Sequence, residues 1–493
     1  MRASSERGML AIVLHTHMPY VEGFGTWPFG EEWLWEAISS SYLPLADLLD
    51  GGAPLTLSLS GVLCDQLEAP GIGERFADFV SDVRRLTHEL DVAGLRAASE
   101  EALACELERS WGDYSGALKA LLARGGDVLG ALAPHAQWTS SATHAVLPLL
   151  ASEPGIRMQV QTGIDAHRRR FGGSWRGGFW LPECAYAPWL ERPLEQAGVR
   201  AVCVELTDRF GLGASEHLRP IATESGVVLV PIDRATIRLL WSDEGYPAAG
   251  AYRDYHHRTV HDHNPWNNAG GAYEHARALA LARAHAGDFV ARTIARLQNA
   301  TRARPGGGGL VVCALDTELL GHWWYEGIYW LEAVVGECAR QGLELVRLDD
   351  ALERLEPVAV TDVQSAAPAR AGAPGAMLRE QEFPSSSWGA DGDLSTWSGP
   401  AVAEMAFATR AAELQVLRAG ARASTAAARE LMALQASDWA FMVSRGVAAP
   451  YATERFEGHR VALLRALAEP GDVGLQGLRN LAIDADRAAL LGP

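Results

Sequence analysis

The stretch Leu310-Val311-Val312-Cys313-Ala314-Leu315, followed directly by Asp316-Thr317-Glu318, decides the fold that we expect for this chain. An unbroken run of apolar residues of this length predicts a buried strand of a parallel sheet. The run ends on two acids, and residues 321–327 then add a histidine and three large aromatic side chains. Acids transfer protons or act as nucleophiles, and flat aromatic rings stack on the apolar faces of sugars. The pattern therefore predicts a carbohydrate-processing site at a strand end.

A second stretch has the same form. Gly178-Phe179-Trp180-Leu181-Pro182 runs into Glu183, and Tyr186 follows closely. Two carboxylates at strand ends, each beside aromatic side chains, suggest a glycoside-processing site. A helix cap or a salt bridge is the ordinary alternative for such an acid, and Glu318 and Glu326 compete for the role of Asp316. We predict Glu183 and Asp316 as the catalytic pair.

Short apolar runs alternate with longer amphipathic stretches over the first 350 or so residues. The predicted strands are Met9–Leu14, Leu55–Ser60, Val128–Ala133, Gly178–Pro182, Val199–Glu205, Val227–Ile232, Leu310–Leu315 and Leu343–Leu348. Alternation of strands and helices indicates an α/β fold with a parallel sheet, and over this length a βα barrel is the leading form. Chemistry in such barrels collects at the carboxyl ends of the strands. His15, Glu183 and Asp316 each lie at such an end.

The organisation along the chain predicts several parts. We expect a catalytic barrel over residues 1–355, with a helical insertion at 71–126 and a lid loop at 242–272, where the sequence is rich in Tyr, His, Gly and Asp without periodicity. The Pro/Ala/Gly-rich residues 356–377 read as a linker. Residues 378–493 read as a C-terminal helical domain.

Composition narrows the class of protein. The 493 residues carry a formal net charge of −18, which repels phosphate backbones and makes nucleic acid an unlikely partner. The six cysteines are scattered without a CxxC pair, and no apolar segment approaches the length of a membrane span. We expect a cytoplasmic protein that does not bind membranes.

His15-Thr16-His17 places two histidines on the same face at a strand end. Such a pair is common at zinc sites, where a third ligand completes the site. Hydrogen bonding to substrate and a purely structural role are the alternatives, and all three stay open on these residues alone. The loop histidines of residues 256–263 read as solvated side chains.

Two aromatic motifs lie beyond the linker. Ser387-Trp388-Gly389 opens a Gly/Asp-rich turn that also carries Trp397, and its acids lack the spacing of a calcium loop. Ala436-Ser437-Asp438-Trp439 follows a helical run, where a tryptophan ordinarily packs into the domain core. Neither motif identifies a function by itself.

In chain order, these segments resemble glycoside hydrolase family 57, and within it the α-1,4-glucan branching enzymes. The resemblance is carried by His15-Thr16-His17-Met18-Pro19, Ser140-Ser141-Ala142-Thr143-His144, Trp180-Leu181-Pro182-Glu183-Cys184, Ala314 to Trp324, Ser387-Trp388-Gly389 and Ala436-Ser437-Asp438-Trp439. It implies an incomplete (β/α)7 barrel with a helical insertion and a C-terminal helical domain that shapes the cleft. One of the eight predicted strands must then be wrong or lie outside the barrel.

The resemblance also implies roles. Glu183 would be the nucleophile and Asp316 the proton donor and base of a retaining transglycosylase that cuts α-1,4-glucan and forms α-1,6 branches, without metal or cofactor. The predicted substrate contacts are His15, His17, His144, Trp180, Tyr246, His322, Trp323, Trp388, Trp397, Asp438 and Trp439. An α-amylase-type hydrolase or a 4-α-glucanotransferase on the same site is the alternative, as is a zinc-dependent deacetylase or mannosidase-like enzyme using His15 and His17. A non-catalytic glucan-binding protein is disfavoured because both acids are present. We expect a monomer or a small homo-oligomer.

Overall fold

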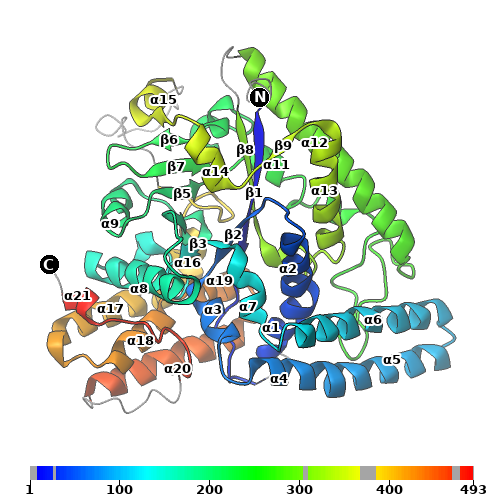
Figure 1. Ribbon diagram of the computed structural model, residues 1–493. Coiled ribbons are helices and arrows are strands. Elements are labelled where there is room, and N and C mark those ends of the chain that lie inside the picture. The colour runs from blue at the N-terminus through cyan, green and yellow to red at the C-terminus, as the bar shows by residue number, and fades with distance from the viewer. Residues whose placement is uncertain (1–7, 26–28, 304–308, 367–384, 469–477, 492–493) are drawn as a thin grey trace.

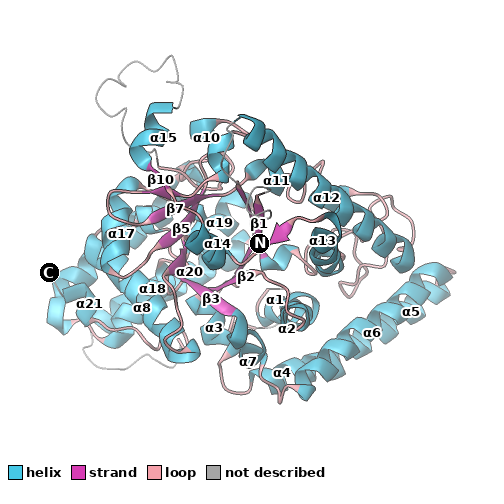
Figure 2. Cartoon of the chain, turned by 45° about the horizontal axis from the view of Figure 1, so that its top comes forward, coloured by secondary structure: helices cyan, strands magenta, loops and turns pink. Residues whose placement is uncertain are grey.

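A computed structural model describes residues 8–25, 29–303, 309–366, 385–468 and 478–491. Its centre is a curved sheet whose strands are β1 (Met9–Thr16), β2 (Thr56–Leu59), β3 (Ala136–Ser140), β4 (Gly178–Trp180), β5 (Ala201–Val204), β6 (Ile221–Ala222), β7 (Val228–Pro231), β8 (Leu310–Asp316), β9 (Glu344–Leu345) and β10 (Val358–Ala359). The strands follow one another in an arc with helices packed outside it (Figures 1 and 2).

Seven parallel strands form the barrel, in the order β7-β5-β4-β3-β2-β1-β8. The two ends of this row meet where the backbone N–H of Asp233, just after β7, donates to the carbonyl of Val312 in β8 at 2.9 Å. Short strands β6 and β10 extend the sheet beyond β7, and β9 pairs with β1. The structure confirms the predicted incomplete (β/α)7 barrel.

The register of the central strands places the site. His15 is paired with Ser58 of β2 on one side and with Asp316 of β8 on the other. Because the strands are parallel, their carboxyl ends meet at one edge of the barrel, and Trp180 ends β4 at that same edge. The residues that follow these strands therefore face a common space.

One predicted strand is wrong and one was missed. Residues 128–133, predicted as a strand, instead begin helix α7 (Val128–Leu132), because Asp127 caps it by accepting from the N–H of Gly130 at 2.7 Å. The barrel strand is β3, whose Gln137, Thr139 and Ser140 interrupt any apolar run. The predicted strand at 343–348 contributes only the two residues of β9, outside the ring of seven.

The other helices up to residue 366 have the following bounds: α1 (Glu31–Ala37), α2 (Leu43–Asp50), α3 (Gly61–Leu67), α4 (Ile72–Asp78), α5 (Arg85–Ala97), α6 (Glu101–Ala123), α8 (Glu153–Phe171), α9 (Glu191–Gln196), α10 (Thr207–Phe210), α11 (Arg234–Ile237), α12 (His275–Ala303), α13 (Gly327–Gln341), α14 (Leu348–Arg354) and α15 (Val360–Ala366). Helices α5 and α6 lie antiparallel and project from the barrel within the predicted insertion (Figure 1). Strand β10 and helix α15 occupy the first part of the predicted linker, and residues 367–377 lie outside the described residues.

The C-terminal part is helical: α16 (Ser395–Ser398), α17 (Ala403–Ala419), α18 (Thr425–Leu434), α19 (Ser437–Arg445), α20 (Ala449–Ala468) and α21 (Ala488–Leu491). Its apolar core takes in Tyr20, Val62, Ala142 and Met158 from the barrel, so the two parts share one packed interface. Among the described helices, none is both long and apolar enough to cross a membrane. The domain boundaries expected from the sequence stay predictions.

The segment predicted as a lid, 242–272, is firmly attached to the helices around it. The guanidinium of Arg253 lies 4.4 and 4.0 Å from the ring centroids of Tyr273 and Tyr325, and it is ion-paired with Glu106 of α6. The imidazole of His261 bonds Asp91 of α5 at 2.6 Å. The helical insertion therefore holds this segment over the barrel.

Candidate active site

A cavity of about 1510 Å³ opens at the carboxyl edge of the barrel. Its lining includes both predicted catalytic acids, and it is shared by strand ends, the segment around Arg253, the helical insertion and the C-terminal region. Residues far apart in the sequence thus meet in one space, which is large enough for several sugar rings.

Glu183 sits in a strained turn after β4. Its backbone has φ 61° and ψ 21°, and Cys184 also has a positive φ of 48°, both uncommon for residues other than glycine. The segment 386–388 holds this turn, because Tyr186 and Ser386 exchange two backbone hydrogen bonds and the N–H of Trp388 donates to the carbonyl of Glu183 at 3.0 Å. The strain is maintained by contacts from the C-terminal part of the chain.

The carboxylate of Glu183 accepts two hydrogen bonds. The indole N–H of Trp388 donates to Oε2 at 3.0 Å, and the hydroxyl of Ser437 lies 3.1 Å from Oε1. Burial raises the pKa of Glu183 to about 6, while these two donors oppose that rise. Both donors come from beyond residue 385, so the barrel alone does not complete this side of the site.

Asp316 ends β8 and has different surroundings. Among the described residues, no group donates a hydrogen bond to its carboxyl, which lines the cavity. Burial raises the pKa of Asp316 well above its ordinary value, and the nearby charges of Glu318 and Glu183 raise it further. Burial thus favours the protonated form of Asp316, and no hydrogen-bond donor among the described residues opposes it as Trp388 and Ser437 do at Glu183.

Glu318, the competing acid, is already engaged. Its Oε1 accepts from the hydroxyl of Tyr42 at 2.6 Å and from the backbone N–H of His17 at 3.1 Å. Burial raises the pKa of Glu318 to about 7, against the effect of the Tyr42 donor. The free carboxyl of Asp316 is better placed than Glu318 to give a proton to a substrate.

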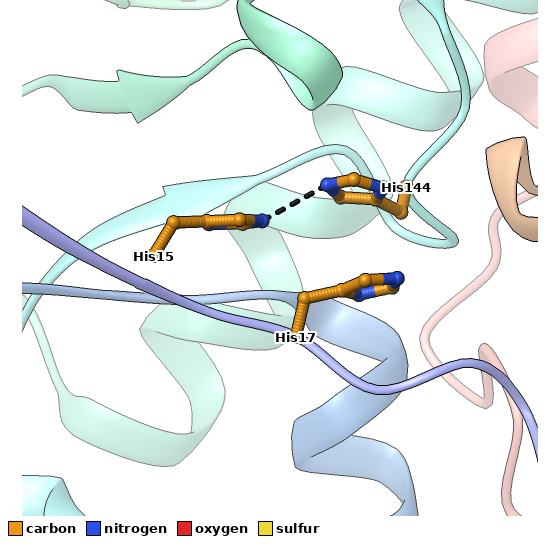
Figure 3. A group of neighbouring side chains, drawn as sticks. All are labelled: His15, His17 and His144. Atoms are coloured by element: carbon orange, nitrogen blue, oxygen red, sulfur yellow. Dashed lines mark hydrogen bonds between the residues drawn. The ribbon is translucent and has the colours of Figure 1, made fainter. Parts of the chain in front are cut away.

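The three predicted histidines lie together, and each ring nitrogen described here has a protein partner (Figure 3). His15 and His144 join through their Nε2 atoms at 2.9 Å, whereas His17 bonds Ser60 through Nδ1 and Asp438 through Nε2, both at 3.0 Å. Burial lowers the pKa of His17, but Asp438 and the neighbouring carboxylates outweigh it, so the pKa ends above its ordinary value. The contact with Asp438 therefore favours the protonated form of His17.

Their ligand nitrogens lie within 4.8 Å of one another, which is close enough to consider a metal ion. The ring planes argue against one. His17 and His144 stack face to face, with centroids 3.8 Å apart and an interplanar angle of 17°. The lone pair of an imidazole nitrogen lies in the ring plane, and two stacked planes do not converge on an ion about 2 Å from each nitrogen. The geometry favours a hydrogen-bonded group, and the absence of a metal stays a prediction.

Most of the predicted substrate contacts line the cavity. These are His17, His144, His322, Trp323, Trp388, Trp397 and Asp438. Trp323 is 38% exposed and meets the 46% exposed Trp241 edge to face, with centroids 5.6 Å apart. Oδ2 of Asp438 is buried with no partner among the described residues, so it is free to accept from a sugar hydroxyl.

The other four predicted contacts do not line the cavity, and their role as substrate contacts stays a prediction. His15 and Trp180 are buried behind the cavity, stacked at 4.7 Å, and Trp439 is buried with its indole N–H donated to the carbonyl of Ala433. Tyr246 stacks on His285 and donates to Asp288 of α12 at 2.7 Å. Hydrophobic packing and a helix partner explain these side chains without a sugar.

Sequence reasoning missed three residues of the site. Ser437 contacts Glu183 directly, Tyr42 holds Glu318, and Trp241 offers an exposed ring within the cavity. Ser437 belongs to a motif that the sequence did single out, but a lone serine has no pattern that marks its partner. Trp241 adjoins the segment predicted as a lid, where an aromatic residue was a usable signal.

Comparison with known proteins agrees with this geometry. Residues 138–364 match the model of glycosyl hydrolase family 57, and residues 401–475 match the C-terminal region of 1,4-alpha-glucan branching enzymes. The 1,4-alpha-glucan branching enzyme of Thermococcus kodakarensis is 31% identical, over 91% of this chain and 72% of that one.

Solved structures show the same fold over nearly all of the chain. The branching enzyme of Pyrococcus horikoshii superposes with a TM-score of 0.87 at 28% identity, covering 99% of this chain and 97% of that one. An alpha-amylase of Thermotoga maritima has a TM-score of 0.79 at 22% identity, covering 99% of each chain, and shows the fold alone. The fold is thus shared by enzymes of different activity, while the C-terminal match and the sequence identity point to one group. The chain belongs to glycosyl hydrolase family 57 and carries the C-terminal region of its branching enzymes.

Proposed function

We propose that this protein is a 1,4-α-glucan branching enzyme, in which Glu183 is the nucleophile and Asp316 the proton donor and base. The observation that carries the proposal is the difference between the two acids within one cavity. Burial raises the pKa of both acids, but two hydrogen-bond donors oppose that rise at Glu183, whereas nearby acids add to it at Asp316. One acid of each kind is what retaining glycoside chemistry requires.

In the first step a carboxylate oxygen of Glu183 bonds to the anomeric carbon of an α-1,4-linked glucose. The bond from that carbon to the glycosidic oxygen breaks, and the departing oxygen takes the proton of Asp316. In the second step Asp316 takes the proton of an acceptor's 6-hydroxyl. That oxygen bonds to the anomeric carbon as the ester to Glu183 breaks, which forms an α-1,6 branch with overall retention.

The cavity supports a polymeric substrate. The exposed rings of Trp323 and Trp241 offer stacking faces, and Asp438 and His322 offer polar contacts. A neutral α-glucan is unaffected by the acidic surface, unlike a nucleic acid. All six cysteines are free thiols and five are buried, which supports a reducing compartment such as the cytoplasm.

The test is incubation with amylose, followed by enzymatic debranching and chain-length analysis of the released chains. New α-1,6 branches that the Glu183→Gln variant does not make would support the proposal. New reducing ends without branches would identify a hydrolase on the same site. Prior dialysis against a chelator should leave the yield unchanged, because the histidine nitrogens are already hydrogen-bonded within the protein.

A further inference from the structure

A chain of hydrogen bonds leads from Ser58 on strand β2 to Glu183, and only its last bond, from Ser437, enters the mechanism above. Oγ of Ser58 lies 3.3 Å from Nδ1 of His15, whose Nε2 lies 2.9 Å from Nε2 of His144. Nδ1 of His144 lies 2.8 Å from Oγ of Ser437, and that oxygen lies 3.1 Å from Oε1 of Glu183. We call Ser58, His15, His144 and Ser437 the histidine chain.

The ionised carboxylate gives the histidine chain one direction of donation. A carboxylate only accepts, so the hydroxyl of Ser437 donates to Glu183 and accepts from Nδ1–H of His144. His144 then has a bare Nε2, which accepts from Nε2–H of His15. Nδ1 of His15 in turn accepts from the hydroxyl of Ser58. Each histidine is thereby neutral and has one defined tautomer.

Burial and packing agree with this pattern. Desolvation lowers the pKa of His15 and of His144 well below the ordinary value, and the neighbouring histidines lower it further. Trp180 stacks under the His15 ring at an interplanar angle of 9°, and the backbone N–H of Ser437 donates to the carbonyl of His144 at 3.2 Å. Neutral, fixed rings are what a one-way chain needs.

We propose that His15 and His144 are positioning residues that act through Ser437, aiming its hydroxyl at the carboxylate of Glu183. The inference rests on the proposed role of Glu183 as nucleophile. It assigns to His15, which lies outside the cavity, an effect on catalysis without any contact with sugar.

The first test reads the tautomers and needs no activity. In protein carrying ¹⁵N-labelled histidine, long-range nitrogen–proton spectra distinguish protonated from bare ring nitrogens. We expect His144 protonated at Nδ1 and His15 at Nε2, with signals assigned from the His15→Gln variant and from the shift of the His144 Nδ1 signal in Ser437→Ala. A wild-type His144 protonated at Nε2 would overturn the proposal, whether or not the enzyme makes branches.

The second test reads the acid side of the pH profile of kcat/KM on amylose, by branches or by reducing ends, whichever the enzyme makes. Ser437→Ala removes a donor to the charged nucleophile, so we expect a loss of about threefold to tenfold below pH 6 and much less at pH 8. Ser437→Thr keeps the hydroxyl and should restore most of the loss. The matched control is Ser444→Ala, because this half-buried serine on the same helix donates only to the carbonyl of Phe441.

The two ends of the histidine chain should act as one unit. His15→Leu leaves Nε2 of His144 without a donor, so the proton of His144 is free to move from Nδ1 to Nε2. The hydroxyl of Ser437 can then donate to the bare Nδ1 of His144 instead of to Glu183. We expect the same loss below pH 6 as in Ser437→Ala, no further loss in the double variant, and milder loss in His15→Gln, whose amide still donates. Losses that multiply in the double variant, or an acid limb that Ser437→Ala leaves in place, would contradict the proposal.

Discussion

The two sides of the active site are built in opposite ways. On the Glu183 side, the C-terminal segments bring an indole N–H and a hydroxyl to the carboxylate, and backbone bonds hold its turn. On the other side, the strand end brings Asp316 close to Glu318, and no group among the described residues donates a hydrogen bond to the Asp316 carboxyl. Burial raises the pKa of both carboxyl groups, and hydrogen-bond donors oppose the rise only at Glu183. The difference teaches that the chemistry depends on what surrounds each acid more than on the acids themselves.

Replacing each acid by its amide tests this comparison most severely. Glu183→Gln should leave less than about a hundredth of the activity on any glucan substrate, because no leaving group compensates for a lost nucleophile. Asp316→Asn should lose about 10²–10⁴-fold on amylose but far less on a maltooligosaccharide with an activated leaving group, which needs no proton. The measurement is the rate of each variant on amylose and on the activated maltooligosaccharide.

If Asp316→Asn loses the same activity on the two substrates, the proton donor is another residue. Glu318 would then be the next candidate, since burial raises its pKa to about 7. Circular dichroism and thermal melting of each variant serve as the control for folding.

Removing one donor from the Glu183 side should move that acid toward the behaviour of Asp316. Trp388→Phe keeps a ring but loses the N–H bonded to Oε2, and a hydrogen bond to a charged group is worth about 1.5–3 kcal/mol. We expect kcat/KM to fall about tenfold or more below pH 6, with partial recovery at higher pH. Trp330→Phe, where the buried indole nitrogen has no partner among the described residues, controls for lost packing. An equal fall at every pH in Trp388→Phe would point to lost sugar stacking instead.

The pH profile of the wild type sharpens the comparison without any mutation. Glu183 must be ionised, so activity should rise with pH through about 6, by about tenfold per pH unit below that value. Asp316 must be protonated, so activity should fall as the pH rises through its strongly raised pKa. In Trp388→Phe only the acid limb should move. Movement of the alkaline limb alone would reverse the two assignments.

The sequence predicted the acid side better than the nucleophile side, for physical reasons. Asp316 follows a long apolar run, so its strand and its place at the barrel edge could be inferred from local pattern. Strand β3, which leads to His144, is half polar, so no apolar run marked it. Its Gln137 accepts from the N–H of Leu57, and the indole N–H of its Trp138 donates to Asp349. Ser437 reaches Glu183 across 254 positions, a contact that only the folded C-terminal helices create.

The aromatic residues show the same division between pattern and packing. Trp439 and Trp180 stand beside acids in the sequence, yet both are buried, whereas Trp388 and Trp323 line the cavity. Residue type and neighbours predict that a tryptophan matters. Which side of it faces the cavity depends on helix orientation, which no local signal fixes.

The smallest expected effect concerns two aromatic residues at the start of the predicted lid. Trp241 lines the cavity against Trp323, whereas Tyr246 faces α12 through Asp288 and His285. If exclusion of water from the covalent intermediate depends on rings within the cavity, Trp241→Ala should lower the ratio of new α-1,6 branches to new reducing ends by a few-fold. Tyr246→Phe loses one partly exposed hydrogen bond, worth about 0.5–1.5 kcal/mol, so it should lower Tm slightly and leave the ratio unchanged. A ratio that falls in Tyr246→Phe but not in Trp241→Ala would mean that the tyrosine leaves α12 and closes over the intermediate during turnover, which would restore the lid role predicted from the sequence.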